Sequence, residues 1–326
     1  MLVKRVLDDG GSIIPLFVPA EHTGGTGLCN PSVLVEQDRV LVNIRHVQYS
    51  LYHAEFDTKY PSRWGPLTYM HPEDDLTLRT VNYLAEFTRD LELKSLSKID
   101  TSNLDVPPIW TFIGLEDGRL VNWNDKNYLI GVRRDTKDNG EGRMEYSELE
   151  FTDAGVKEVS RTRIESPAPS YCEKNWMPVL NKPNHFVKWS NPVEVVEADL
   201  ETGTSKTVFQ GTQKLKLPRD LRGSSQVVEI NKYYVAITHE TDFWYDEYGY
   251  KNAKYYHRFV VWDLEWNFVK VTKPFKFMDG WIEFCTGMDV LGNSILITFG
   301  FQDNTAYLLK APLKTIIDFI NNEHEF

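Results

Sequence analysis

The sequence predicts an all-β protein: a five-bladed β-propeller followed by a short C-terminal helix. Two observations favour this fold. Helical periodicity is scarce along the 326 residues, whereas short runs of strand-forming residues separated by turns recur throughout. Each recurring unit also has the same order, a polar or charged motif, a strand, a tight turn and a second strand, which is typical of a propeller blade.

Five such units are predicted, and we expect them to form a single domain over 1–326. They recur at irregular intervals of roughly 40–70 residues, so the chain lacks the strict period of a WD40-type array. A pair of β-sandwiches would also explain the strand alternation, but not the motif before each unit. The predicted blades lie at about 28–56, 112–150, 174–200, 223–265 and 282–312.

Turn residues divide each unit into a hairpin. They interrupt the strand runs at 36–38, 124–127, 191–192, 231–232 and 292–293. Between the first two blades, 57–108 is predicted to be a long excursion, in which 80–91 is compatible with a helix. At the other end of the chain, Leu313, Ile316, Ile317 and Ile320 lie at helical spacing and predict the C-terminal helix.

Composition excludes several classes of protein. The net charge of −11 argues against nucleic-acid binding as the main role, because such proteins need a basic surface. The cysteines are three and widely spaced, which is typical of neither a disulfide framework nor a zinc site, and we expect no metal. No apolar run is long enough to span a membrane. A reducing cytoplasm is the simplest expected location. The sequence leaves open whether the protein forms an oligomer.

The polar motifs that open the units carry most of the functional information. They lie at 30–31, 116–119, 173–178, 222–226 and 283–287. Because the inner strand of each blade begins near one mouth of the central channel, these residues are expected to converge there. A convergent set of charged and amide side chains suits a ligand with many hydroxyl groups. We expect Asp117 and Asp303 to face one another across this mouth, with Lys174 and Trp176 between them.

These motifs, in this order, resemble those of glycoside hydrolase family 130, five-bladed propellers that include mannoside phosphorylases and mannosidases. That family opens its first blade with Asn-Pro and its second with Glu-Asp-Pro-Arg, and closes with a Gly-Ala-Ala-Asp-Thr-like stretch. The matching segments here lie at 30–31, 116–119, 174–178, 300–305 and 311–313. Gly118 stands where the family has Pro, and each motif is short, so the ordered set carries the resemblance.

The resemblance implies a carbohydrate-active enzyme that cleaves or transfers a mannoside-like unit with inversion, with Asp117 as proton donor. It also implies inorganic phosphate as a co-substrate of the phosphorylases, but 185–191 lacks the Arg or His that usually ends this strand in them. Hydrolysis, phosphorolysis and transfer from a sugar phosphate or nucleotide sugar therefore stay open. The alternatives are a propeller-fold glycosyltransferase and a non-catalytic, lectin-like propeller.

Glycosidic cleavage needs a proton on the leaving oxygen and a second group on the opposite face of the sugar. Glu116, next to Asp117 on a strand, is expected to point the other way and to be structural. For the opposite face the candidates are Asp303, Glu173, Glu240 and Glu283. The candidates for stacking on a sugar ring are Trp176, Trp244, Tyr255 and Tyr256, of which Trp176 is favoured. The segment 245–256 is predicted to be an exposed hairpin tip. The expected ligand-binding residues are Asn30, Arg45, Arg119, Arg134, Lys174, Trp176, His239, Glu283 and Asp303.

Overall fold

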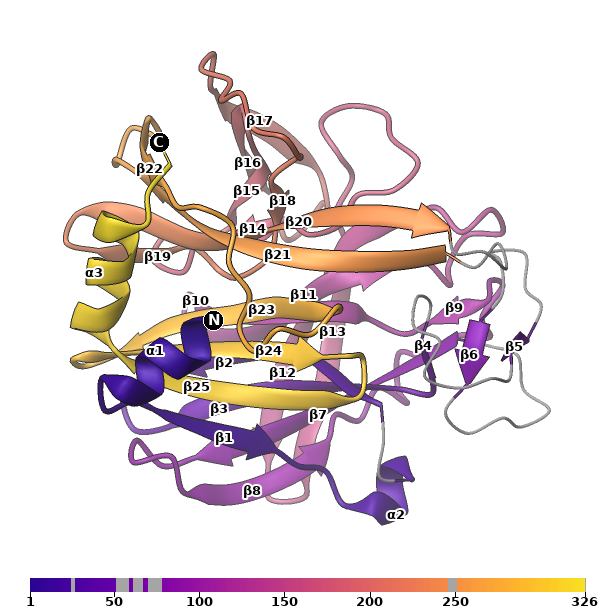
Figure 1. Cartoon of the computed structure of the whole chain (residues 1–326). Coiled ribbons are helices and arrows are strands. Elements are labelled where there is room, and N and C mark those ends of the chain that lie inside the picture. The colour runs from indigo at the N-terminus through magenta and orange to yellow at the C-terminus, as the bar shows by residue number, and fades with distance from the viewer. Residues whose placement is uncertain (25–26, 51–58, 61–66, 70–77, 246–250, 326) are drawn as a thin grey trace.

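The computed structural model describes residues 1–24, 27–50, 59–60, 67–69, 78–245 and 251–325. Five sheets of at least four strands are arranged as the blades of a propeller, and their strands are antiparallel apart from one short parallel pair in the first blade (Figure 1). The predicted all-β class, the five blades and the C-terminal helix are confirmed. Of the predicted blade ranges, 51–56 lies outside the described residues, as does 246–250 of the predicted hairpin tip.

The first three blades each contain four strands in chain order from the centre outward. The strands of the first are β2 (Leu28–Val35), β3 (Val40–Val47), β7 (Leu78–Phe87) and β8 (Leu93–Lys98). The strands of the second are β10 (Glu116–Trp123), β11 (Lys126–Arg133), β12 (Arg143–Thr152) and β13 (Gly155–Arg163). The strands of the third are β14 (Met177–Pro178), β15 (His185–Ser190), β16 (Val193–Ala198) and β17 (Ser205–Gln210).

The fourth blade has a divided inner strand, because two short segments pair with the same neighbour. Its strands are β18 (Arg222–Gly223), β19 (Val228–Ile230), β20 (Tyr233–Tyr245), β21 (Lys251–Trp262) and β22 (Phe268–Val271). Four small strands lie beside the first blade: β4 (Tyr49–Ser50), β5 (Lys59–Tyr60), β6 (Leu67–Tyr69) and β9 (Phe112–Ile113).

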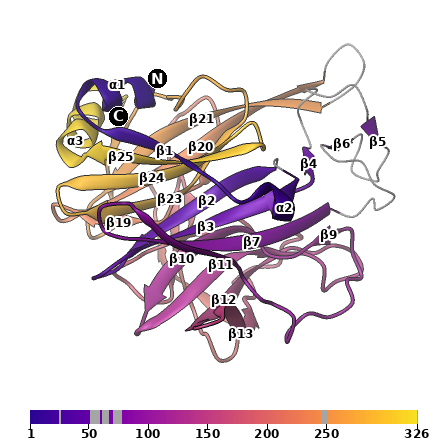
Figure 2. The same ribbon diagram turned by 90° about the horizontal axis from the view of Figure 1, so that it is seen from below.

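The fifth blade joins the two ends of the chain. Its inner three strands are β23 (Glu283–Leu291), β24 (Ser294–Phe301) and β25 (Thr305–Pro312), and its outer strand is β1 (Ser12–Leu16). Three helices are described, α1 (Leu2–Asp8), α2 (Ala20–Thr23) and α3 (Leu313–Asn322). Both views show α1 and α3 together at this blade (Figures 1 and 2), so the termini close the ring.

The predicted blade ranges are too short, because they miss the outer strands. These edge strands bury few side chains; β8, for example, is exposed or half-exposed at every position. Without a buried face they lack the apolar alternation by which strands are recognised. The segment 80–91 is not a helix but forms most of β7 and the turn after it; its buried positions do not alternate strictly, which obscures the strand period. The strand β1 was not predicted either, since its partner β25 lies almost 300 residues away.

Gln226 joins the inner strands near the axis. Its side chain is fully buried, and its Nε2 donates to the carbonyl oxygens of Val33 (2.8 Å) and Leu120 (2.9 Å). Its Oε1 accepts a hydrogen bond from the Met288 amide at 2.8 Å. One amide from the fourth blade therefore satisfies backbone groups of the first, second and fifth blades, which holds the inner strands in register at low desolvation cost.

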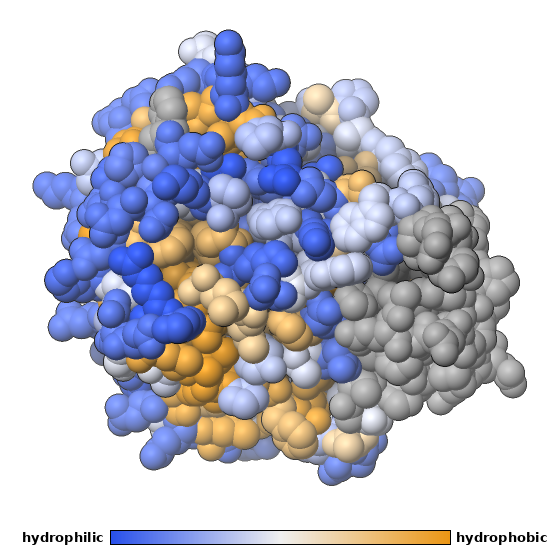
Figure 3. All heavy atoms as spheres, in the orientation of Figure 1, coloured by the Kyte–Doolittle hydropathy of each residue, from blue (hydrophilic) through white to orange (hydrophobic). Residues whose placement is uncertain are grey.

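The outer surface carries both hydrophilic and hydrophobic areas. The face in Figure 3 is mostly hydrophilic, with hydrophobic surface gathered in its lower left part. No helix in the described part of the chain is both long and apolar enough to cross a membrane.

Candidate active site

A cavity of about 420 Å³ receives residues from all five blades. We call it the axial cavity. Most of its lining residues precede or begin the inner strands, as the sequence predicted, because those strands start at one end of the ring. The lining residues are Cys29, Asn30, Arg45, Val47, Tyr49, Glu116, Asp117, Lys174, Asn175, Arg222, His239, Phe243, Tyr255, Ile282, Phe284 and Asp303.

Two adjacent carboxylates, Glu116 and Asp117, both line this cavity, and each side chain is 15% exposed. The expectation that Glu116 points away is wrong. Regular strands alternate their side chains, but the pairing of β10 with β11 shifts register between Glu116 and Arg119. Asp117 in this bulge has a φ of 52°, so the alternation is broken and both carboxylates reach the same space.

Arg45 holds this pair from the neighbouring blade. Its Nη1 lies 2.6 Å from Asp117 Oδ1, and its Nη2 lies 3.4 Å from Glu116 Oε2. The guanidinium is itself fixed by Thr80 Oγ1 (3.1 Å) and the Tyr49 hydroxyl (3.1 Å). Asn30 Nδ2 adds a 2.6 Å hydrogen bond to Asp117 Oδ1. The carboxylate of Asp117 is therefore placed by groups from β2 and β3 of the first blade.

Arg119 supports Asp117 from behind. Its Nη1 donates to the Asp117 carbonyl oxygen at 2.6 Å and its Nε to the Ser224 carbonyl oxygen at 2.9 Å. It is 1% exposed and does not line the cavity. Arg119 therefore does not contact a ligand in this cavity but holds the main chain of Asp117, which fixes the bulge.

The two carboxyl groups have pKa values shifted in opposite directions. Burial raises the pKa of Glu116, and the attraction of Arg45 does not cancel this effect; the charge of Asp117 raises it further. Burial also acts to raise the pKa of Asp117, but Arg45, Arg119 and the hydrogen bond from Asn30 outweigh it and hold that pKa below its ordinary value. A proton bound to the pair therefore resides mainly on Glu116.

Left-handed backbone is concentrated at this cavity. Four of its non-glycine lining residues have positive φ: Asn30 (43°), Asp117 (52°), Asn175 (62°) and Asp303 (51°). Such conformations cost free energy for residues with a Cβ, although Asn and Asp tolerate them best. Strain of this kind collects at sites where side chains must be aimed, which supports a functional role for the cavity.

The remaining cations of the cavity are Lys174 and Arg222. Within the part of the chain that the structure describes, neither has a carboxylate at ion-pair distance. His239 is buried, with its ring stacked on Tyr255 and edge-on to Phe284. Burial and the nearby His257, Arg222 and Lys174 lower its pKa well below the ordinary value, so the imidazole is neutral at pH 7. The positive charge available to a ligand thus comes from Lys174 and Arg222.

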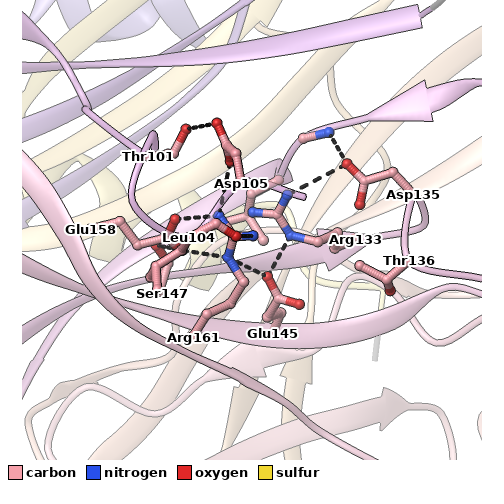
Figure 4. A network of polar contacts seen from close by, with 12 residues as sticks. Thr101, Leu104, Asp105, Arg133, Asp135, Thr136, Glu145, Ser147, Glu158 and Arg161 are labelled. Carbon is pink, nitrogen blue, oxygen red and sulfur yellow. Dashed lines mark hydrogen bonds and ion pairs between the residues drawn. The ribbon is translucent and has the colours of Figure 1, made fainter. Parts of the chain in front are cut away.

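A second polar cavity, of about 300 Å³, lies between the first two blades. We call it the outer cavity; Figure 4 shows the network at its wall. Arg133 Nε lies 2.5 Å from Glu145 Oε1, and Arg161 Nη2 lies 2.5 Å from Glu158 Oε2. Glu158 Oε1 also accepts a 2.6 Å hydrogen bond from Ser147. These arginines are bound to carboxylates of the chain itself, so the network is structural.

No group of three or more His, Cys, Asp or Glu side chains suitable for a metal ion occurs among the described residues. Glu116 and Asp117 of the axial cavity instead form ion pairs with Arg45.

With this geometry in view, the similarity to solved structures can be stated. A β-1,2-mannobiose phosphorylase from Listeria innocua, solved with β-1,2-mannobiose, matches with a TM-score of 0.57 and 12% identity over 96% of this chain and 100% of that one. A structure reported for family 130 glycoside hydrolases that target β-1,2 mannosidic linkages in Candida mannan matches with a TM-score of 0.58 and 11% identity over 89% and 85% of the two chains.

A mannose phosphorylase from Leishmania mexicana, solved with a phosphate ion, matches with a TM-score of 0.51 and 10% identity over 97% of this chain and 93% of that one. The chain has the five-bladed fold of family 130. The resemblance predicted from the motifs is thereby confirmed at the level of the fold. No protein-family model matches the sequence, and no curated protein sequence matches it.

The structure brings six of the ten predicted site residues into the axial cavity: Asn30, Arg45, Asp117, Lys174, His239 and Asp303. The other four do not line it. Trp176 is 1% exposed, packs on Phe186 and donates from Nε1 to Glu173 Oε2 at 2.9 Å, so it is a core residue and not a stacking surface. Arg119 supports Asp117 as described above.

Glu283 and Arg134 also have structural partners. The Glu283 carboxylate accepts backbone hydrogen bonds from Phe277, Met278 and Gly280, which fixes the segment before β23. Arg134 Nε donates to the Gly140 carbonyl oxygen at 2.9 Å. Among the candidates for the opposite face, Glu173 and Glu240 are buried and bonded to Trp176 and Arg258 respectively. Asp303 alone of these candidates lines the cavity.

Arg222, Phe243 and Phe284 line the cavity but were not among the predicted ligand-binding residues. Arg222 opens the fourth-blade motif and could have been found by the rule that selected Lys174. Phe243 carried no such signal, because it projects from the far end of β20, beyond the part of that strand that pairs with β18.

Proposed function

We propose that this protein is a carbohydrate-active enzyme that cleaves or transfers a mannoside-like glycosyl unit with inversion of configuration. The observation that carries the proposal is the carboxylate pair Glu116 and Asp117, clamped by Arg45 at a cavity formed by all five blades. The solved structures of the same fold that act on mannosides support the choice of sugar.

In this proposal Asp117 is the general acid that protonates the leaving oxygen. Two carboxyl groups whose pKa values are pushed apart by their surroundings are a typical acid–base couple. Because the pair's proton resides mainly on Glu116 and Asp117 is ionised, the proposed step passes the Glu116 proton through Asp117 to the leaving oxygen, and solvent then reprotonates Glu116. Asn30 and Arg45 orient Asp117, while Arg119 holds its backbone.

Inversion requires an attacking group on the sugar face opposite the leaving oxygen. Lys174 and Arg222 favour an anion in the axial cavity, because neither lies at ion-pair distance from a carboxylate among the described residues. Inorganic phosphate is the proposed acceptor, and its attack on the anomeric carbon of a β-mannoside would release α-mannose 1-phosphate. For water as the acceptor, Asp303 is the proposed base.

The test is a screen of β-mannosides, sugar phosphates and nucleotide sugars, run with and without phosphate, with the product anomer read by NMR. We expect turnover of β-1,2-mannobiose to an α-configured product, stimulated by phosphate. A β-configured product would contradict inversion. Glycan binding without turnover of any compound would favour the alternative, a lectin-like propeller, which needs a polar cavity but no proton donor.

A further inference from the structure

The axial cavity adjoins a second space that we call the side groove, with a volume of about 360 Å³. Arg222 and Phe243 line both, so the two spaces share a wall. The side groove lies between the loop before β18 and the far half of β20. Its lining residues are Leu217, Pro218, Arg219, Asp220, Arg222, Thr241, Asp242 and Phe243.

The wall formed by β20 has hydrogen-bonding groups to offer. β18 pairs with β20 only through Arg222–His239 and Gly223–Thr238. From Glu240 onward, β21 is the one strand in the described chain that pairs with β20, so the other edge of β20 borders the groove. The Thr241 Oγ1 is buried and lacks a hydrogen-bond partner among the described residues. A hydroxyl-rich ligand would supply the missing partner.

Phe243 forms an aromatic surface at the junction. It is 42% exposed, although large aromatic side chains are usually buried, and the Arg222 guanidinium carbon lies 5.9 Å from its ring centroid. An exposed ring beside charged and hydroxyl groups presents an apolar face with polar groups at its edge. The C–H face of a sugar ring and its equatorial hydroxyls complement such a surface.

Charge at the side groove is balanced. Arg219 binds Asp242 in a bidentate pair, with Nε–Oδ1 at 2.5 Å and Nη2–Oδ2 at 2.6 Å. Asp220 and Arg222 contribute one further charge of each sign. A phosphate or nucleotide would meet the carboxylates of Asp220 and Asp242 here, so the groove favours a neutral ligand, whereas the axial cavity also contains Lys174.

We propose that the substrate is a neutral oligosaccharide longer than a disaccharide, which extends from the axial cavity across Phe243 into the side groove. This inference rests on the proposed function: the two units flanking the cleaved bond lie at Glu116 and Asp117, and the next units occupy the side groove. Phe243 stacks on a sugar ring and Thr241 binds a hydroxyl, so both determine chain-length specificity.

The experiment compares kcat/KM for β-1,2-mannobiose and β-1,2-mannotetraose in the presence of phosphate. The wild type should favour the tetrasaccharide by about tenfold, as expected for one stacking contact. Phe243→Ala should reduce this ratio to near one. Thr241→Val, which keeps the side-chain size and removes the hydroxyl, should reduce it a few-fold. Tyr233→Ala is the matched control, because Tyr233 lies on the same strand with the same 42% exposure but away from both spaces; it should keep the ratio.

Equal kcat/KM for the two lengths in the wild type would overturn the inference and leave the proposed function standing. If neither length is turned over, the proposed function fails. Calorimetry on the same proteins then tests whether the side groove binds the additional sugar units. Tighter binding of the tetrasaccharide that Phe243→Ala abolishes would still support it, whereas equal or absent binding would overturn it. The inference is also overturned if Phe243→Ala weakens GDP-mannose binding but not tetrasaccharide binding.

Discussion

The axial and outer cavities are both lined by arginines and carboxylates, yet their chemistry differs. In the outer cavity Arg133 and Arg161 are bound to Glu145 and Glu158. Among the described residues, Lys174 and Arg222 of the axial cavity have no carboxylate at ion-pair distance, and Glu116 Oε1 is buried without a hydrogen bond.

The backbone differs too. Four non-glycine residues that line the axial cavity have positive φ, whereas none of those described at the outer cavity does. The density of polar groups therefore does not identify a site by itself. Asp135 Oδ1 at the outer cavity is also buried without a hydrogen bond among the described residues, so the cations without a carboxylate partner and the strained backbone are what distinguish the axial cavity.

The largest effect that we predict is the loss of catalysis when the axial cavity is altered, which would sharpen the contrast between the two cavities. Asp117→Asn should lower turnover by roughly 10²–10⁴-fold, the usual contribution of a general acid, while sugar binding is retained. The amide keeps the shape of the side chain but cannot deliver the proton. Steady-state kinetics and calorimetry on the same preparation provide the measurement. Turnover within threefold of the wild type would remove Asp117 from the mechanism.

A substitution at the outer cavity should change the stability of the protein and leave turnover unchanged. Glu145→Gln leaves the buried Arg133 without its closest carboxylate, which is expected to cost about 3–5 kcal/mol in the free energy of unfolding. Turnover of the folded variant should be unchanged. Glu150→Gln, an exposed position on the same strand, is the control and should change stability by less than about 0.5 kcal/mol. A loss of turnover without a loss of stability in Glu145→Gln would reverse the assignment of the two cavities.

The smallest expected effect is the pH dependence of stability. The lowered pKa of Asp117 means that its ionised form stabilises the fold above the unfolded-state pKa, near the ordinary 3.8. This contribution is lost as the pH falls through the lower pKa of the folded state. Wild type should therefore exceed Asp117→Asn in stability at pH 7, and the gap should narrow at pH 3. Urea unfolding at both pH values checks this; a constant gap would show that the carboxylate charge is not stabilised by Arg45.

Much of the axial cavity could be predicted from the sequence. Asn30, Asp117 and Lys174 were found because each directly precedes or opens an inner strand, and the closed ring brings those positions together. Glu116 was misplaced because a bulge breaks the alternation on which the prediction rested, and a bulge has no dependable signal in one sequence. Trp176 has the residue type of a sugar platform, but burial decides its role, and burial follows from the packing of neighbouring blades.

The fold could also be predicted only in part. Hairpins with a buried face and turn residues were predicted, and the left-handed pairs Asn124-Asp125 and Asn231-Lys232 stand at two of the expected turns. The closing strand β1 and the polar outer strands depend on partners far away in the chain or at the edge of a sheet. Neither leaves a local pattern, so tertiary contacts alone define them.

The central claim is that the axial cavity binds the sugar with Asp117 at the bond to be cleaved. A crystal structure of Asp117→Asn soaked with β-1,2-mannobiose tests this most directly. We predict a disaccharide in the axial cavity, with the glycosidic oxygen or a neighbouring hydroxyl within hydrogen-bond distance of the side chain at position 117, and no sugar in the outer cavity. Sugar bound away from residue 117, or only in the outer cavity, would contradict the account.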